Sequence, residues 1–136
     1  MLGKASHAYK YFPVVDIVNQ RVNESYWAAY AAECANEQGK FWDYHDLLYA
    51  RWKGEFAGTY TKAKLKSYAV ELNLDPAKFD ACLDTEKTKP IVDADVAEAR
   101  RLGLPGTPTF FLNGRQMEIG SLEFPEFQRA FDLILK

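Results

Sequence analysis

The spacing of apolar positions predicts a chain that is mostly helical. From Asn23 to Leu102, apolar side chains recur at steps of three and four residues, which is the pattern of helices with one buried face. The predicted helices cover residues 23–35, 41–52, 62–72, 76–83 and 88–102. The clearest start is Asp75-Pro76, where an N-cap residue is followed by proline at the first helical position.

Two segments break this helical spacing and predict strands. Ala8–Val15 is aromatic and β-branched, with a proline near its end, and it predicts a short strand that runs into a loop. Pro108–Leu112 predicts a second strand, which the turn Asn113-Gly114 joins to a return strand over Arg115–Ile119. The apolar positions of a predicted C-terminal helix are Phe124, Phe127, Phe131, Ile134 and Leu135. This order of elements predicts helices packed on a small sheet, an α/β or α+β arrangement.

Composition and charge narrow the class of protein. A chain of 136 residues with 48% hydrophobic and 15% aromatic side chains has the size and apolar content of one globular domain. The net charge of −2 comes from 17 basic and 19 acidic side chains, and without a basic run nucleic acid is not an expected partner. No stretch reaches the roughly 20 apolar residues of a membrane span, and residues 1–7 lack the apolar region of a signal peptide. As written, the chain is expected to be soluble and untargeted.

Two cysteines and two histidines are the candidates for thiol or metal chemistry. Cys34 and Cys82 are 48 positions apart on apolar helix faces, and three interpretations stay open: a structural disulfide, two buried thiols, or a redox pair. His45 is interpreted as a helix-packing residue rather than a proton-transfer group or metal ligand. Because His7 is the only other histidine, no metal site is expected, and no cofactor is indicated.

For the clustered aromatic and acidic side chains, a structural role is preferred over a functional one. The aromatic residues of the second predicted helix are Phe41, Trp42, Tyr44, Tyr49 and Trp52. At helical spacing such residues are usually core, with a substrate surface as the alternative. A set of acidic residues is expected on solvated faces, and no pair of them stands out for acid–base catalysis. These residues are Glu33, Glu37, Asp43, Asp46, Asp93, Asp95 and Glu98.

Pro108 stands at the entry to the β-rich run that ends at Leu112. Because proline donates no backbone hydrogen bond, it is costly inside a ladder and needs a positional reason. A cis peptide bond between Thr107 and Pro108 would supply that reason, whereas base rates favour an ordinary trans proline in a turn. The residues alone leave this choice open.

Three separated motifs carry a resemblance to a known family. Residues 103–114 contain the run Gly-Thr-Pro-Thr-Phe-Phe, residues 31–48 contain Gln-Gly-Lys-Phe-Trp, and residues 74–83 contain Leu-Asp and Cys-Leu at their ends. The first motif looks like the cis-proline loop, strand and hairpin of DsbA-like proteins of the thioredoxin fold. The other two are similar to the inserted helical region of that family, in the expected order, so the resemblance covers nearly the entire chain.

The resemblance implies an α/β fold, namely an incomplete thioredoxin fold with a helical insertion and a small sheet that ends in a β-hairpin plus a C-terminal helix. A single domain would cover residues 1–136. Within it, residues 1–22 would form a strand and a loop, and residues 23–102 the helical insertion. Residues 103–136 would form the cis-proline loop, the hairpin and the C-terminal helix.

The same resemblance implies roles for four residues. Pro108 would face the catalytic thiols of the family, and Thr107 would offer backbone groups to an extended substrate peptide. Cysteines at the positions of Cys34 and Cys82 occur in an exported member of the family, which favours a disulfide. A bridge that closes this 48-residue loop would stabilise the fold by roughly 4 kcal/mol on the chain-entropy relation.

The expected function depends on one difference from the family pattern, the missing Cys-x-x-Cys motif. In the family, a strand and a helix that bears Cys-x-x-Cys precede the strand similar to Tyr9–Val14, and neither is found here, so no catalytic residue is assigned. The chain is expected to be a truncated thiol-disulfide oxidoreductase family domain that is redox-inactive alone. The alternatives are a non-catalytic module that binds peptides through the cis-proline groove, and an enzyme completed by another chain.

The absence of the family's central strand also predicts that the chain forms oligomers. It would leave the edges at Tyr9–Val14 and at Pro108 without a neighbour, and unpaired apolar edges are templates for another chain. A homodimer or higher oligomer is therefore expected, unless the segment before Asp16 pairs directly with residues 108–112. The family resemblance and a disulfide favour an extracytoplasmic location, whereas a chain complete as written would be cytoplasmic.

Overall fold

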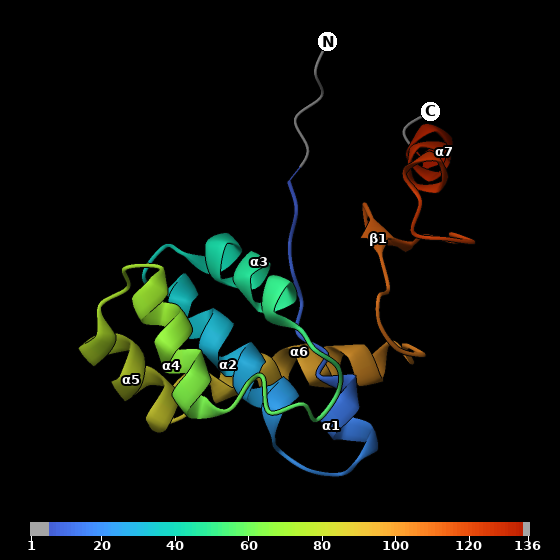
Figure 1. Cartoon of the computed structure of the whole chain (residues 1–136). Coiled ribbons are helices and arrows are strands. Elements are labelled where there is room, and N and C mark those ends of the chain that lie inside the picture. Colours follow the sequence, from blue (N-terminus) through green and yellow to red (C-terminus); the bar gives the residue numbers. More distant parts are fainter. Residues whose placement is uncertain (1–5, 135–136) are drawn as a thin grey trace. The chain divides into compact units, whose positions relative to one another are not determined.

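The computed structural model describes residues 6–134. The chain divides into two compact units, Met1–Gly103 and Leu104–Lys136, and each is described by itself (Figure 1). The single domain expected over residues 1–136 stays a prediction. Leu135 was predicted to belong to the C-terminal helix, and residues 1–5 to a segment that lacks a signal peptide. Both positions lie outside the described residues. From Ser6 to Ile134, no helix is long and apolar enough to cross a membrane.

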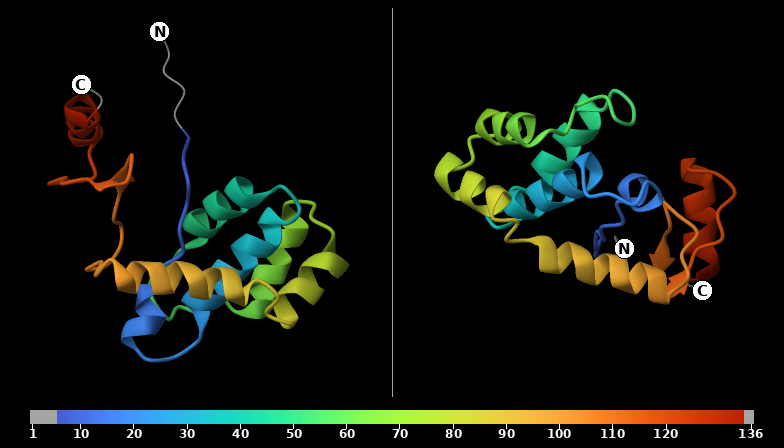
Figure 2. Two further views of the ribbon diagram at one scale, coloured as in Figure 1. Left: turned by 180° about the vertical axis from the view of Figure 1, so that it is seen from behind. Right: turned by 90° about the horizontal axis from the view of Figure 1, so that it is seen from below.

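The first unit is a bundle of helices arranged around one central helix. Its helices are α1 (Val14–Val18), α2 (Glu24–Asn36), α3 (Phe41–Arg51), α4 (Lys62–Glu71), α5 (Pro76–Asp84) and α6 (Lys89–Arg101). Helix α2 packs against each of the other five. Figures 1 and 2 show α2 inside this unit, with α3, α4 and α6 around it.

The five helices predicted from the apolar spacing are confirmed to within one residue at each end. Two of their starts have side-chain caps: the Lys78 N–H donates to Asp75 Oδ1 at 3.1 Å, and the Lys64 N–H donates to Thr61 Oγ1 at 3.4 Å. Asn23 is at the N-cap of α2 but makes no side-chain cap hydrogen bond. The short α1 was not predicted.

The core of the first unit combines small residues on α2 with large side chains from its neighbours. Ala31 and Ala35 of α2 are fully buried, and so are Tyr44 of α3 and Phe79 of α5, whose rings lie 5.5 Å apart. The Tyr44 hydroxyl donates to the Leu65 carbonyl at 2.8 Å, so the buried polar atom is satisfied. This core holds α3, α4 and α5 against α2.

The strand predicted over Ala8–Val15 is wrong. Residues 6–13 form neither strand nor helix, and α1 begins at Val14. In the described part of the first unit, the segment has no strand to pair with. Instead, the Tyr11 N–H donates to the Asp95 carboxylate at 3.0 Å, so a side chain takes the place of a ladder partner.

The prediction that the aromatic residues of α3 are core is correct for only part of the helix. Tyr44 is fully buried and Phe41 packs against the core, but Trp42, Tyr49 and Trp52 are 45%, 66% and 60% exposed. Helix α3 contacts α2 and α4 along one face. Trp42 and Tyr49, seven residues apart, lie on the other face and remain in contact with solvent.

The second unit is a short hairpin followed by a helix. Strands β1 (Phe111–Leu112) and β2 (Arg115–Gln116) pair antiparallel through a turn at Asn113 and Gly114, which both have positive φ. The hairpin is confirmed, but the strands are shorter than predicted. Helix α7 (Phe124–Ile134) follows, and the Phe127 ring meets Phe110 edge to face at 4.9 Å.

Alkaline pH is predicted to destabilise the first unit through its buried phenols. Burial raises the pKa of Tyr44, and burial together with neighbouring phenols and Glu24 raises the pKa of Tyr60 to about 12. An unfolded phenol titrates near about pH 10, so the folded chain retains protons that the unfolded chain loses above that pH. The free energy of unfolding should be constant with respect to these groups below about pH 10 and should fall above it.

The measurement is urea unfolding by circular dichroism between pH 8 and 11, with tyrosinate absorbance followed in parallel. Tyr44→Phe should reduce the slope above about pH 10 by up to about 1.4 kcal/mol per pH unit, because one buried titrating group is gone. An unchanged slope in that variant would contradict the assignment.

Candidate functional site

The loop that leaves α6 contains the residues predicted to contact a peptide. Gly103, with a φ of +65°, ends the helix, and its N–H donates to the Arg100 carbonyl at 3.0 Å. The peptide bond between Thr107 and Pro108 is cis. The Thr109 hydroxyl donates to the Gly106 carbonyl at 2.7 Å and closes a turn around this bond.

Thr107 and Pro108 are both exposed. Across residues 6–134, no hydrogen bond engages the backbone N–H or carbonyl of Thr107. The loop from Leu104 to Phe110 has no titratable side chain. At Thr107 the loop presents one backbone donor and one backbone acceptor beside the Pro108 ring.

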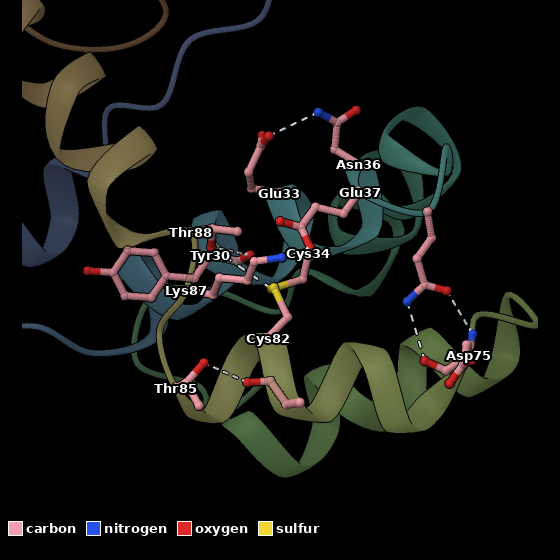
Figure 3. Close-up of a disulfide and its surroundings, with 12 residues drawn as sticks. Tyr30, Glu33, Cys34, Asn36, Glu37, Asp75, Cys82, Thr85, Lys87 and Thr88 are labelled. Carbon is pink, nitrogen blue, oxygen red and sulfur yellow. Dashed lines mark hydrogen bonds and ion pairs between the residues drawn. A yellow bond between two sulfur atoms is a disulfide. The ribbon is translucent and has the colours of Figure 1, made fainter.

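Cys34 of α2 and Cys82 of α5 form a disulfide, with their Cα atoms 5.9 Å apart (Figure 3). Both residues are almost completely buried. Thr88 lies beside the bond, with its hydroxyl 3.9 Å from the Cys34 sulfur, and this hydroxyl donates to the Tyr30 carbonyl at 3.0 Å. Of the three interpretations of the cysteines, the disulfide is confirmed. The chain contains only these two cysteines and has no free thiol.

One acidic residue was placed wrongly on a solvated face. Asp95 is buried, and its carboxylate accepts hydrogen bonds from Lys10 Nζ at 2.9 Å and from the Tyr11 N–H at 3.0 Å. The signal was present in the spacing, because position 95 falls on the same stripe of α6 as Val92 and Val96. Its contacts are those of a structural anchor for the N-terminal segment.

Two more carboxylates that the sequence reasoning did not single out fix irregular backbone. Asp16 is 1% exposed, and its Oδ2 accepts from the N–H groups of Asn23 at 2.8 Å and Tyr26 at 3.0 Å. Glu24 accepts from the N–H groups of Gly58 at 3.0 Å and Tyr60 at 2.9 Å. These carboxylates hold loops to the bundle.

His45 has the packing role that was predicted for it. Its ring contacts Tyr9, Phe41, Trp42 and Tyr49 at centroid distances between 4.8 and 5.8 Å. Its Nδ1 lies 2.9 Å from Asp46 Oδ1. Among residues 6–134, no group of three His, Cys, Asp or Glu side chains is placed to hold a metal ion.

Comparison with known families decides the relationship. The family described as Thioredoxin matches residues 3–132. The chain belongs to the thioredoxin family. The fold prediction is thereby confirmed, since a mostly helical thioredoxin-like domain with a two-stranded antiparallel sheet corresponds to an incomplete α/β thioredoxin fold. Membership of the thioredoxin family indicates a function of the thiol-disulfide oxidoreductase type.

Curated relatives that contain a similar segment are much longer than this thioredoxin-family chain. The Na(+)/H(+) antiporter NhaA 1 of Salinispora arenicola is 42% identical over 89 residues, which are 65% of this chain and 13% of that protein. The antiporter NhaA 3 of Salinispora tropica is 36% identical over 110 residues, which are 81% of this chain and 16% of that protein. The chain thus spans less than a fifth of these relatives. No solved structure matches it significantly.

Removal of the disulfide is predicted to destabilise the first unit. The bond closes a loop of 48 residues, so its loss should lower the free energy of unfolding by roughly 4 kcal/mol. Urea unfolding of a Cys34→Ala, Cys82→Ala double variant measures this change. Reduced wild type is the control, because it lacks the bond but keeps both side chains. A change under about 1 kcal/mol in both samples would show that the bond adds little to stability.

Proposed function

We propose that this chain is the peptide-contacting portion of a DsbA-like thiol-disulfide oxidoreductase domain. In this proposal, the loop at Thr107 and Pro108 binds an extended polypeptide. A Cys-x-x-Cys pair that is not among these 136 residues carries the redox chemistry. The observation that carries the proposal is the exposed loop at Thr107 and Pro108, where the backbone groups of Thr107 have no partner among the described residues.

Backbone pairing is the mode of binding that this loop supports. An extended peptide that adds to a strand edge gains main-chain hydrogen bonds, and side-chain contacts add specificity. Thr107 can supply both a donor and an acceptor, whereas Pro108 has no N–H and limits pairing beyond it. Phe111, which is 42% exposed, offers an apolar contact at the first position of β1.

Neither cysteine among the 136 residues is available as a free thiol. Thiol–disulfide exchange requires a thiolate that can attack a sulfur atom. Both cysteines are joined to each other, and both are buried against α2 and α5. We therefore expect the isolated chain to bind a peptide without reducing it. A non-catalytic binding module, the second candidate function, is favoured by the same exposed loop and by the missing thiolate.

Peptide binding and turnover are tested together on the whole chain. Carboxymethylated insulin B chain, labelled with a fluorophore, should bind the wild type, and Pro108→Ala should weaken binding at least about fivefold, because the exposed Pro108 ring lies directly beside the Thr107 backbone that the peptide would pair with. Pro105→Ala is the matched control, since Pro105 is exposed in the same loop. Insulin reduction with dithiothreitol should proceed no faster with the chain than without it.

Two outcomes overturn parts of this proposal. Equal binding by wild type and Pro108→Ala would remove the loop from the peptide site. Turnover close to that of an intact thioredoxin-fold enzyme would show that Cys34 and Cys82 carry redox chemistry. An enzyme completed by another chain predicts that turnover appears only after a second polypeptide with Cys-x-x-Cys is added, whereas a binding module predicts no turnover in that mixture.

We further propose that the chain self-associates as a homodimer or higher oligomer. In the first unit, most backbone groups of residues 8–12 have no strand partner among the described residues. In the second unit, α7 exposes Phe124 and Leu133, which are 75% and 65% exposed. Surfaces of this kind favour pairing with another chain, so that elements of one copy cover those of the other.

Light scattering coupled to size exclusion measures the mass of the particle. A mass at least twice the 15.5 kDa of one chain is expected at micromolar concentration. A compact monomer that unfolds cooperatively across this range would contradict self-association and would support pairing within one chain.

A further inference from the structure

The first unit has an open depression with aromatic walls, and the peptide-binding proposal does not use it. Its volume is about 480 Å³. It lies where the N-terminal segment passes the end of α2 and the start of α3. The aromatic side chains that line it are His7, Tyr9, Tyr11, Phe41 and Trp42. Residues of α2, of the loop before α3 and of the first turn of α3 complete the lining.

Glu33 is a fixed carboxylate in this depression. The Tyr11 hydroxyl donates to its Oε2 at 2.8 Å, and the Asn36 amide donates to its Oε1 at 3.0 Å. Figure 3 shows Glu33 and Asn36 on the side of α2 that points away from the disulfide. Burial, and after it the Glu33 carboxylate, raise the pKa of Tyr11, so the phenol keeps its proton and continues to donate.

Glu33 lacks a cationic partner in the described part of the chain. The other carboxylate of the lining, Asp43, already pairs with Lys40 at 2.7 Å. Glu33 is half-buried, and two neutral donors hold it in place without cancelling its charge. Among the described residues that line the depression, one negative charge, that of Glu33, is therefore uncompensated.

The aromatic rings around Glu33 hold each other in place and still face solvent. His7 stacks on Trp42 with centroids 5.0 Å apart, Phe41 meets Trp42 edge to face at 4.8 Å, and Tyr9 lies 5.4 Å from Phe41. Tyr9 remains 37% exposed and Trp42 45% exposed. Ring faces attract cations, and rings already fixed by packing lose little conformational freedom when a ligand binds.

We propose that this depression binds a basic side chain, an arginine before a lysine, presented by a partner polypeptide. The Glu33 carboxylate pairs with the cation, and the exposed parts of the Tyr9 and Trp42 rings pack against it. Arginine is preferred because its planar guanidinium can stack on a ring while its edge donates to a carboxylate. A purely apolar occupant is disfavoured because it would cover the Glu33 charge without a partner.

The probe is the tripeptide acetyl-Gly-Arg-Gly-amide, and its neutral match has citrulline in place of arginine. Nuclear magnetic resonance titration of the whole chain should shift the amides of Asn36 and Gly39. The arginine peptide should bind up to about fivefold more tightly than the citrulline peptide, which is the upper end of what an exposed ion pair supplies. Added salt should reduce this difference, because it screens exposed charges.

Two variants and two controls locate the interaction. Glu33→Gln should abolish the preference for arginine, and Trp42→Ala should weaken the binding of both peptides. Trp52→Ala is the matched control, because Trp52 is an exposed tryptophan at the end of α3 that does not line the depression. Pro108→Ala should leave arginine binding unchanged, which separates this site from the proposed peptide loop.

The site is refuted if the arginine peptide shifts no lining amide at millimolar concentration. It is also refuted if citrulline binds as well as arginine, or if Glu33→Gln retains the preference. Glu33→Gln keeps the size of the side chain and an acceptor for the Tyr11 hydroxyl, so it should remain folded, and its circular dichroism spectrum verifies this.

Discussion

Close packing against α2 is the interaction on which the first unit depends. Four alanines of this helix are buried, and side chains this small let neighbouring helices approach its backbone from several directions. Large rings then fill the spaces between the outer helices, as Tyr44 and Phe79 do between α3 and α5. A larger residue at Ala31 or Ala35 would push these helices apart, and the well-packed core has no room to absorb such a change.

Buried and half-buried carboxylates hold the irregular segments to the bundle, as small residues allow the helices to pack closely. Asp16, Glu24 and Asp95 each accept hydrogen bonds from backbone N–H groups of segments outside regular structure. A buried or half-buried carboxylate is tolerated when such donors satisfy it, and bonds to a charged acceptor are stronger than neutral ones. The N-terminal segment, the turn before α2 and the loop before α4 are therefore held by acids on α6, α1 and α2, respectively.

Local patterns predicted the helices well because each helix has its own apolar stripe and its own end signals. The same reasoning failed where burial depends on distant neighbours. Trp42 and Trp52 have the spacing of core residues, yet α3 has too few neighbours to cover them. Asp95 is polar by composition, but its position on α6 decides its environment. The loop at Pro108 was found by resemblance, since one proline in a turn has no distinctive local pattern.

The disulfide also determines which part of the chain would extend under a pulling force. If the two ends of the protein were pulled apart, tension would pass from α2 to α5 through the bond and would bypass α3 and α4 entirely. The segment between Cys34 and Cys82, which are 48 positions apart, could not extend, and this removes about 160 Å of contour length. A translocase that threads the oxidised chain through a narrow pore would have to accommodate a closed loop instead of a single extended strand. Complete passage would therefore require reduction of this bond first.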